Sequence, residues 1–163
     1  METQSKEYSR SGTAVVIQMD GASEEDTSLF FLFTVNQVEE VLSEITLVEI
    51  PFAPEFIQGM CCWRGQVVPV IDIEKRFGLS GSTHTSSGRY LLVRTGAQDS
   101  TGGTQLLRCV FRVPDRIKVI QNVGDSSSIM PEKVGIKSSL VRGTFQQEND
   151  IFIVPDVASI LEK

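Results

Sequence analysis

The chain has 163 residues, with 15 Lys or Arg and 21 Asp or Glu, so its formal net charge is −6. One domain is the default for this length, and an acidic chain without a basic cluster is a poor binder of nucleic acid or of an anionic membrane. No apolar run approaches the ~18 residues of a membrane-spanning helix, so we expect no membrane insertion.

The first third of the chain alternates polar connections with short β-rich runs. We expect residues 1–12 to form a disordered tail, because they are polar, and residues 13–163 to form the folded domain. Ala14–Met19 and Ser28–Val35 are rich in Val, Ile and Phe and enclose an Asp-Gly and an acidic loop, which predicts an antiparallel pair. Val38–Ile45 fits both a helical stripe and a strand, and its eight residues leave the two open.

The middle of the chain contains a strand interrupted by a proline. Gln66–Ile73 is strongly apolar, and Pro69 cannot donate to a ladder, so we expect either an edge strand or a bulge at that residue. Glu74–Gly78 is typical of one helical turn that a glycine ends.

The remaining sequence predicts more short strands and one final helix. Loops are expected over 79–88 and 95–104, and strands over Arg89–Arg94, Leu106–Val113, Ile117–Val123, Ser139–Phe145 and Ile151–Val154. Asp156–Leu161 reads as a C-terminal helix that Asp156 caps. Many short strands with only short helical pieces favour an all-β barrel or sandwich. Because a strand, an Asp and a helical turn follow one another twice, we also expect two similar halves.

Few residues could carry chemistry. Cys61 and Cys62 are adjacent, so their side chains diverge in a strand, and the three cysteines have no metal-ligand spacing. His84 is the only histidine, so no catalytic base is paired with a nucleophile. The glycines of 95–104 lack the lysine and the helix of a phosphate-binding loop. We therefore expect no catalytic residues, no metal and no cofactor. The odd cysteine count and polar N-terminus favour a reducing cytoplasm.

The pair Arg64-Gly65 stands between two apolar runs, where a glycine would allow a tight turn. Either Arg64 simply points to water, or it anchors a partner, since arginine pairs well with carboxylates and is enriched at binding hot spots. In the second case Trp63 and Phe56 would supply apolar contact area.

The order of motifs around this turn resembles the CheW family of chemotaxis coupling proteins. The resemblance is carried by Val38-Glu39-Glu40-Val41, by Ile50–Gly59 (IPFAPEFIQG) and by Arg64–Ile73 (RGQVVPVIDI). Looser matches follow at Asp115–Ile120, Leu140–Gly143 and Phe152–Asp156, so about residues 13–162 are covered. The chain departs from the family pattern just before Arg-Gly, where Cys62-Trp63 replaces the usual Asn-Leu.

The resemblance implies two five-stranded β-barrels around a shared core, short helical turns and no catalysis. It implies an adaptor that docks a methyl-accepting chemoreceptor on one surface and the regulatory domain of a CheA-type histidine kinase on another, in the cytoplasm at receptor arrays. Glu40 and Arg64 match the family's paired Glu and Arg near the receptor-facing surface. The expected partner-binding residues are Val38, Glu40, Val41, Phe56, Gly59, Arg64 and Gly65.

Two alternatives stay open from the residues. The first is a small β-barrel that binds a ligand or senses redox state through Cys61 and Cys62, which requires an accessible thiol of low pKa. The second is a related protein that has lost one of the two partners.

Overall fold

A computed structural model of the chain describes residues 12–19, 27–79, 88–121 and 126–162. The tail expected over residues 1–12, apart from Gly12, and most of the loop expected over 79–88 lie outside the described residues. The elements are β1 (Thr13–Gln18), β2 (Ser28–Thr34), β3 (Val38–Leu42), β4 (Ile57–Trp63), β5 (Gln66–Asp72), α1 (Ile73–Arg76), β6 (Arg89–Gln98), β7 (Thr104–Val113), β8 (Ile117–Gln121), β9 (Ser127–Ser128), two 3₁₀ turns (Pro131–Val134 and Ser138–Leu140), β10 (Val141–Gln147), β11 (Asp150–Pro155) and α2 (Val157–Leu161).

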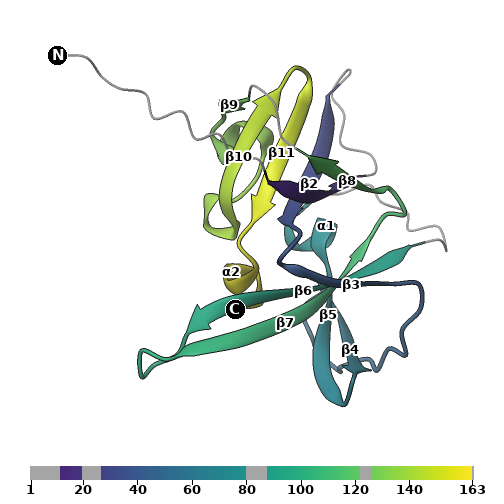
Figure 1. Cartoon of the computed structure of the whole chain (residues 1–163). Helices are drawn as coiled ribbons and strands as arrows, with labels where there is room; N and C mark the ends of the chain where they lie inside the picture. The colour runs from purple at the N-terminus through teal and green to yellow at the C-terminus, as the bar shows by residue number, and fades with distance from the viewer. Residues whose placement is uncertain (1–11, 20–26, 80–87, 122–125, 163) are drawn as a thin grey trace.

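The strands form two sheets, and one of them takes strands from both ends of the chain. The first sheet has the order β8-β1-β2-β11-β10-β9, and the second has the order β3-β6-β7-β5-β4. The first two strands of the chain therefore belong with the last four, and β2 pairs in parallel with β11. Figure 1 shows this arrangement, with the N-terminal strands lying among the green and yellow C-terminal ones. The all-β class with two β subdomains is confirmed; the first sheet has six strands and the second has five.

The second sheet curls back on itself through the connection between β3 and β4. Val48 in this connection exchanges two backbone hydrogen bonds of 2.8 Å with Met60 of β4. Gly59 allows the close approach, because a Cβ on this residue would lie 2.3 Å from the carbonyl oxygen of Val48. The β3–β4 connection thus covers the outer edge of β4 and gives the sheet its barrel-like shape.

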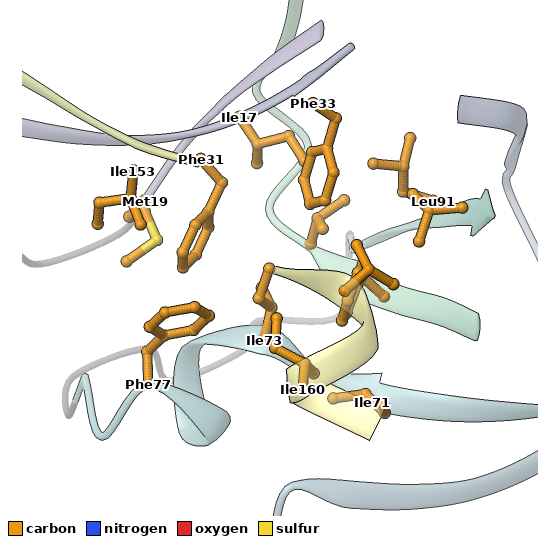
Figure 2. Packing of buried hydrophobic residues seen from close by; sticks show 14 of the residues in the cluster. Ile17, Met19, Phe31, Phe33, Ile71, Ile73, Phe77, Leu91, Ile153 and Ile160 are labelled. Carbon is orange, nitrogen blue, oxygen red and sulfur yellow. The ribbon is translucent and has the colours of Figure 1, made fainter. Parts of the chain in front are cut away.

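Most of the core lies between the two sheets and is built by alternating side chains. On β7, Phe111 points into the shared core and its ring lies 5.7 Å from that of Phe33 on β2, whereas Val110 points to the opposite face of the sheet. Both faces of the central strands are therefore buried, which is why their sequences read as nearly continuous apolar runs. Figure 2 labels Ile17, Met19, Phe31, Phe33, Ile71, Ile73, Phe77, Leu91, Ile153 and Ile160 of the shared core.

Each sheet also encloses a small cluster of its own. The cluster of the second sheet consists of Cys61, Val68, Val70, Leu92 and Val110. The cluster of the first sheet consists of Ala14, Val16, Leu32 and Phe152. Two small interiors beside one shared core are what two fused β subdomains require.

The repeated pattern of strand, Asp and helix has the same structure twice. The carboxylate of Asp72 accepts the backbone N–H of Lys75 (3.1 Å) and begins α1, and the carboxylate of Asp156 accepts that of Ser159 (3.3 Å) and begins α2. Such capping satisfies backbone donors that the first turn leaves without partners. The C-terminal helix is confirmed, and Ile160 on it reaches the shared core (Figure 2).

The ambiguous segment Val38–Ile45 forms a strand over its first five residues, because β3 pairs along β6. The loop expected over 95–104 is wrong for half of its length, because residues 95–98 and 104 belong to strands. The ladder between β6 and β7 continues out to the pair Gln98↔Thr104. Only the turn beyond it is irregular, and there the carboxylate of Asp99 accepts the backbone N–H of Thr101 (2.9 Å). The two strands project as the long arm seen in Figure 1.

The strand that contains Pro69 is not an edge, because β5 lies between β4 and β7. The parallel ladder to β7 begins only at Val70, so no donor is needed from Pro69 on that side. The irregularity occurs in the neighbouring strand instead, where the register shifts between Ile57 and Gly59 of β4.

Candidate functional site: an arginine corner and an apolar strip

The turn between β4 and β5 presents Arg64 to solvent. Trp63 pairs with Gln66, so the connection has only two residues, and both have positive φ: 47° at Arg64 and 77° at Gly65. Positive φ at both central residues is the geometry of a type I′ turn, which matches the twist of the flanking strands. Gly65 adopts it without steric cost, and the Arg64 side chain is 74% exposed. The tight turn expected from Arg-Gly is therefore present.

Glu40 on β3 meets this turn across the barrel. The indole N–H of Trp63 donates to Glu40 Oε2 at 2.8 Å, and the Arg64 guanidinium lies 3.8 Å from the same oxygen. The Arg64 guanidinium also lies 4.8 Å from the centre of the Trp63 ring, within the range of a cation–π contact. The Glu40–Arg64 pair implied by the family resemblance is thus present, but Trp63 takes part in it.

A second set of charges centres on Glu39. Arg108 on β7 forms a forked pair with this carboxylate, with N–O distances of 2.7 and 3.2 Å, and Arg94 on β6 approaches it to 3.4 Å. The hydrogen bonds from Arg108 hold the pKa of Glu39 below its usual value, against the partial burial that raises it. Arg108 also lies 5.5 Å from the Trp63 ring centre, which joins the two sets.

Glu39 and Glu40 both reach this place because β3 is irregular between them. The register with β6 shifts between Val38 and Glu40, which leaves Glu39 as an extra residue. Such a bulge lets neighbouring side chains escape the strict alternation of a strand. Glu39 is therefore not a solvated surface residue, and its side chain is only 14% exposed. We call the six residues Glu39, Glu40, Trp63, Arg64, Arg94 and Arg108 the corner.

The corner borders two hollows. The smaller, of about 340 Å³, is lined by four of the corner residues together with Val35, Asn36 and Val38. The larger, of about 750 Å³, lies between the arm and the first sheet, with Arg94 and Leu106 on one side and Arg142 on the other. Arg94 lines both, so the two hollows adjoin and are bordered by guanidinium groups.

Three of the seven expected contact residues lie away from the corner or face inward. Phe56 packs against the shared core beneath the guanidinium of Arg76, 4.4 Å from its ring centre. Gly59 is buried, and its role is the close approach of the β3–β4 connection, so it offers no surface to a partner. Val41 is 47% exposed and lies farther along β3. Glu40 and Arg64 form an ion pair beside Gly65, and Val38, which packs partly against the shared core, lines the smaller hollow together with Arg64.

An exposed apolar surface continues from β3 into the β3–β4 connection. We call it the apolar strip; it consists of Val41, Leu47, Val48, Ile50 and Phe52. Phe52 is fully exposed and has a φ of 62°, and Val48 is 63% exposed. Glu44, Glu49 and Glu55 beside them are exposed as well. In the sequence, Ile50 and Phe52 are recognisable only as part of the family pattern. Their high exposure depends on how the β3–β4 connection folds.

The three cysteines differ in access. Cys61 and Cys109 are buried, whereas Cys62 is exposed on the opposite face of β4. Burial raises the pKa of the Cys61 thiol, and so does its neighbour Cys62; burial alone raises the pKa of Cys109. A raised pKa lowers the thiolate fraction, which weighs against Cys61 as a redox-active thiol.

The described residues contain no group of three or more His, Cys, Asp or Glu side chains placed to hold a metal ion. Within the same residues, no helix has both the length and the apolar character that crossing a membrane demands.

Comparison with known proteins gives a consistent result. The family described as the CheW-like domain matches residues 21–163. The chemotaxis protein CheW of Treponema pallidum is 28% identical over 124 residues, which span 74% of this chain and 68% of that protein. The chemotaxis protein CheW of Helicobacter pylori is 27% identical over 124 residues, which span 76% and 70%.

Among solved structures, the crystal structure of scaffolding protein TtCheW from Thermoanaerobacter tengcongensis superimposes with a TM-score of 0.69. The match covers 99% of this chain and 95% of that one at 21% sequence identity, so it shows a shared fold.

Proposed function

Since residues 21–163 match its profile, this chain belongs to the CheW-like domain family, and from this premise we propose that it is a non-enzymatic adaptor in chemotaxis-like signal transduction. In this proposal it couples methyl-accepting chemoreceptors to the regulatory domain of a CheA-type histidine kinase. A cytoplasmic position at receptor arrays follows from that role.

The observation that carries the proposal is the apolar strip beside the corner. Five large apolar side chains, each at least 39% exposed, lie along β3 and the β3–β4 connection. Exposed apolar surface that continues over neighbouring residues is typical of a protein interaction site, whereas single exposed apolar residues are ordinary. An adaptor needs such surfaces and needs no bound cofactor.

The charges of the corner and of the apolar strip indicate which partner each surface binds. Residues 41–55, which carry the apolar strip, contain three glutamates and no Lys, Arg or His, so a partner of the apolar strip should carry basic residues around an apolar centre. The hollows at the corner are bordered by arginines instead, which suits an acidic segment. We assign the corner to the chemoreceptor, as the family resemblance implies for Glu40 and Arg64, and the apolar strip to the kinase domain.

The test is calorimetric titration of the whole protein with a chemoreceptor cytoplasmic fragment and, separately, with a kinase regulatory domain. Arg64→Glu should weaken receptor binding, because it replaces a cation with an anion at an exposed position. Phe52→Ser should weaken kinase binding by roughly tenfold or more, as expected when one phenylalanine no longer becomes buried. Neither residue is in the core, so circular dichroism should show an unchanged fold.

Arg89→Glu is the matched control, because Arg89 is also exposed and ion-paired, with Asp115 at 2.8 Å, but lies outside the corner. It should leave both affinities near those of the unmodified protein. Failure of the unmodified protein to bind either partner would refute the adaptor function. Equal effects of Arg64→Glu and Arg89→Glu would refute the assignment of the corner.

A further inference from the structure

We propose that Trp63 determines which partner the corner accepts: its indole holds Glu40 away from Arg64, so that the Arg64 guanidinium pairs with a carboxylate of the receptor. The inference rests on the proposed function and deepens it, because it names the chemistry of the contact and the residue that controls it.

Trp63 and Arg64 compete for one oxygen of Glu40. Glu40 Oε2 accepts the indole N–H at 2.8 Å, the length of a full hydrogen bond. The nearest guanidinium nitrogen of Arg64 is 3.8 Å from that oxygen, too far for a hydrogen bond. The carboxylate is therefore positioned by the indole, and Arg64 has only a long Coulombic contact with it.

The other two arginines of the corner already have partners within the chain. Arg108 makes its forked pair with Glu39 and a further hydrogen bond of 3.1 Å to Gln66. Arg94 approaches Glu39 and also donates to the carbonyl oxygen of Asn36 at 3.1 Å. Arg64 has the longest ion pair of the three and the most exposed side chain, 74% against 46% for Arg94 and 22% for Arg108.

The corner has an excess of positive charge and a hollow in which an anion could bind. Its members carry three guanidinium groups and two carboxylates, a local balance of +1 in a chain of net charge −6. The hollow of about 340 Å³ runs between Arg64 and Arg94, with Trp63 in its lining. Glu39 also lines it, but its charge is balanced by the two arginines bound to it. One carboxylate from a partner would complete the set.

The test is calorimetric titration of the full chain with a chemoreceptor cytoplasmic fragment. Arg64→Gln should weaken binding by roughly three- to tenfold, as expected for one interfacial charge pair. Glu40→Gln should strengthen it by roughly two- to threefold, because the amide oxygen still accepts from the indole while the competing charge is gone. Trp63→Phe should weaken it by roughly threefold, because Glu40 is then free to close onto Arg64.

The double variant Trp63→Phe with Glu40→Gln separates positioning from mere packing. If the indole acts through Glu40, adding Glu40→Gln should restore the affinity that Trp63→Phe removes. If the indole ring itself contacts the receptor, adding Glu40→Gln should not restore the affinity. Replacing the receptor's exposed Asp and Glu residues one at a time by their amides should reveal one position at which Arg64→Gln has no further effect. Glu44→Gln, an exposed glutamate outside the corner, is the control for net charge.

Trp63 is the only tryptophan of the chain, so its fluorescence should change on binding and report directly on this corner.

A weaker complex with Glu40→Gln, or no recovery in the double variant, would overturn the inference while leaving the adaptor function intact. If Trp63→Phe does not fold, the opposed effects of Glu40→Gln and Arg64→Gln decide the question. If the unmodified chain does not bind the receptor fragment, the proposed function fails and this inference fails with it.

Discussion

Replacing Gly59 with alanine tests whether the β3–β4 connection is held in place by close backbone contact. The residue has a φ of 150°, which L side chains rarely adopt, and an added Cβ would lie 2.3 Å from the carbonyl oxygen of Val48. A backbone conformation that L side chains adopt so rarely costs about 1–3 kcal/mol by itself. Because the connection must also move, the two hydrogen bonds between Val48 and Met60 would be lost, at about 0.5–1.5 kcal/mol each. The expected loss in the free energy of unfolding is therefore about 2–6 kcal/mol.

Gly65→Ala is the control, because Gly65 also has positive φ, 77°, but an added Cβ would meet no atom within 4 Å. It should cost only the strain, about 1–2 kcal/mol. Urea denaturation followed by far-ultraviolet circular dichroism measures the free energy of unfolding of both variants. In thermal unfolding, each kcal/mol of lost stability should lower Tm by roughly 2–4 °C for a chain of this size. If Gly59→Ala is no more destabilising than Gly65→Ala, the close contact does not stabilise the connection.

Two further predictions concern ionisation. The hydrogen bonds from Arg108 lower the folded-state pKa of Glu39 below its value in the unfolded chain, so this group stabilises the fold above about pH 4.5 and the contribution is lost as the pH falls through the folded-state pKa. Glu39→Gln should lower stability at pH 7 and flatten the decline below about pH 4.5, measured by urea denaturation across pH; an unchanged slope would contradict it. In thiol titration of the native protein at pH 8, Cys62 should react fast while Cys61 and Cys109, buried and with raised pKa, react slowly, and all three should react in denaturant. Fast, oxidant-sensitive reaction at Cys61 would revive the redox alternative.

The strands could be predicted because their apolar periodicity is local. Ala14–Met19 and Ser28–Val35 gave an antiparallel pair, and each Asp that follows a strand gave a capped helix, because both signals lie within a few residues of sequence. The outer part of the arm could not be predicted, because polar residues with glycines around 95–104 read as a loop. There, strand pairing with a partner across the hairpin outweighs weak local β-propensity.

The centre of the site depended on contacts that no local pattern encodes. The turn at Arg64 could be predicted, since Arg-Gly between two apolar runs favours it. The pairing of Glu39 with Arg108 joins residues 69 positions apart, and it requires both the bulge in β3 and the order of strands in the second sheet. The sequence predicted only apolar contact area from Trp63. Its hydrogen bond to Glu40, 23 positions away, forms because the second sheet curls back on itself.

The parallel pairing of β2 with β11 also limits how the molecule could be divided. A break in the chain between β7 and β8 would leave β1 and β2 on one fragment and their neighbours β8 and β11 on the other. Neither fragment could complete the first sheet, so native structure would return only when both were mixed. A single cut at this connection therefore cannot separate the two sheets, because the first sheet takes strands from both ends of the chain.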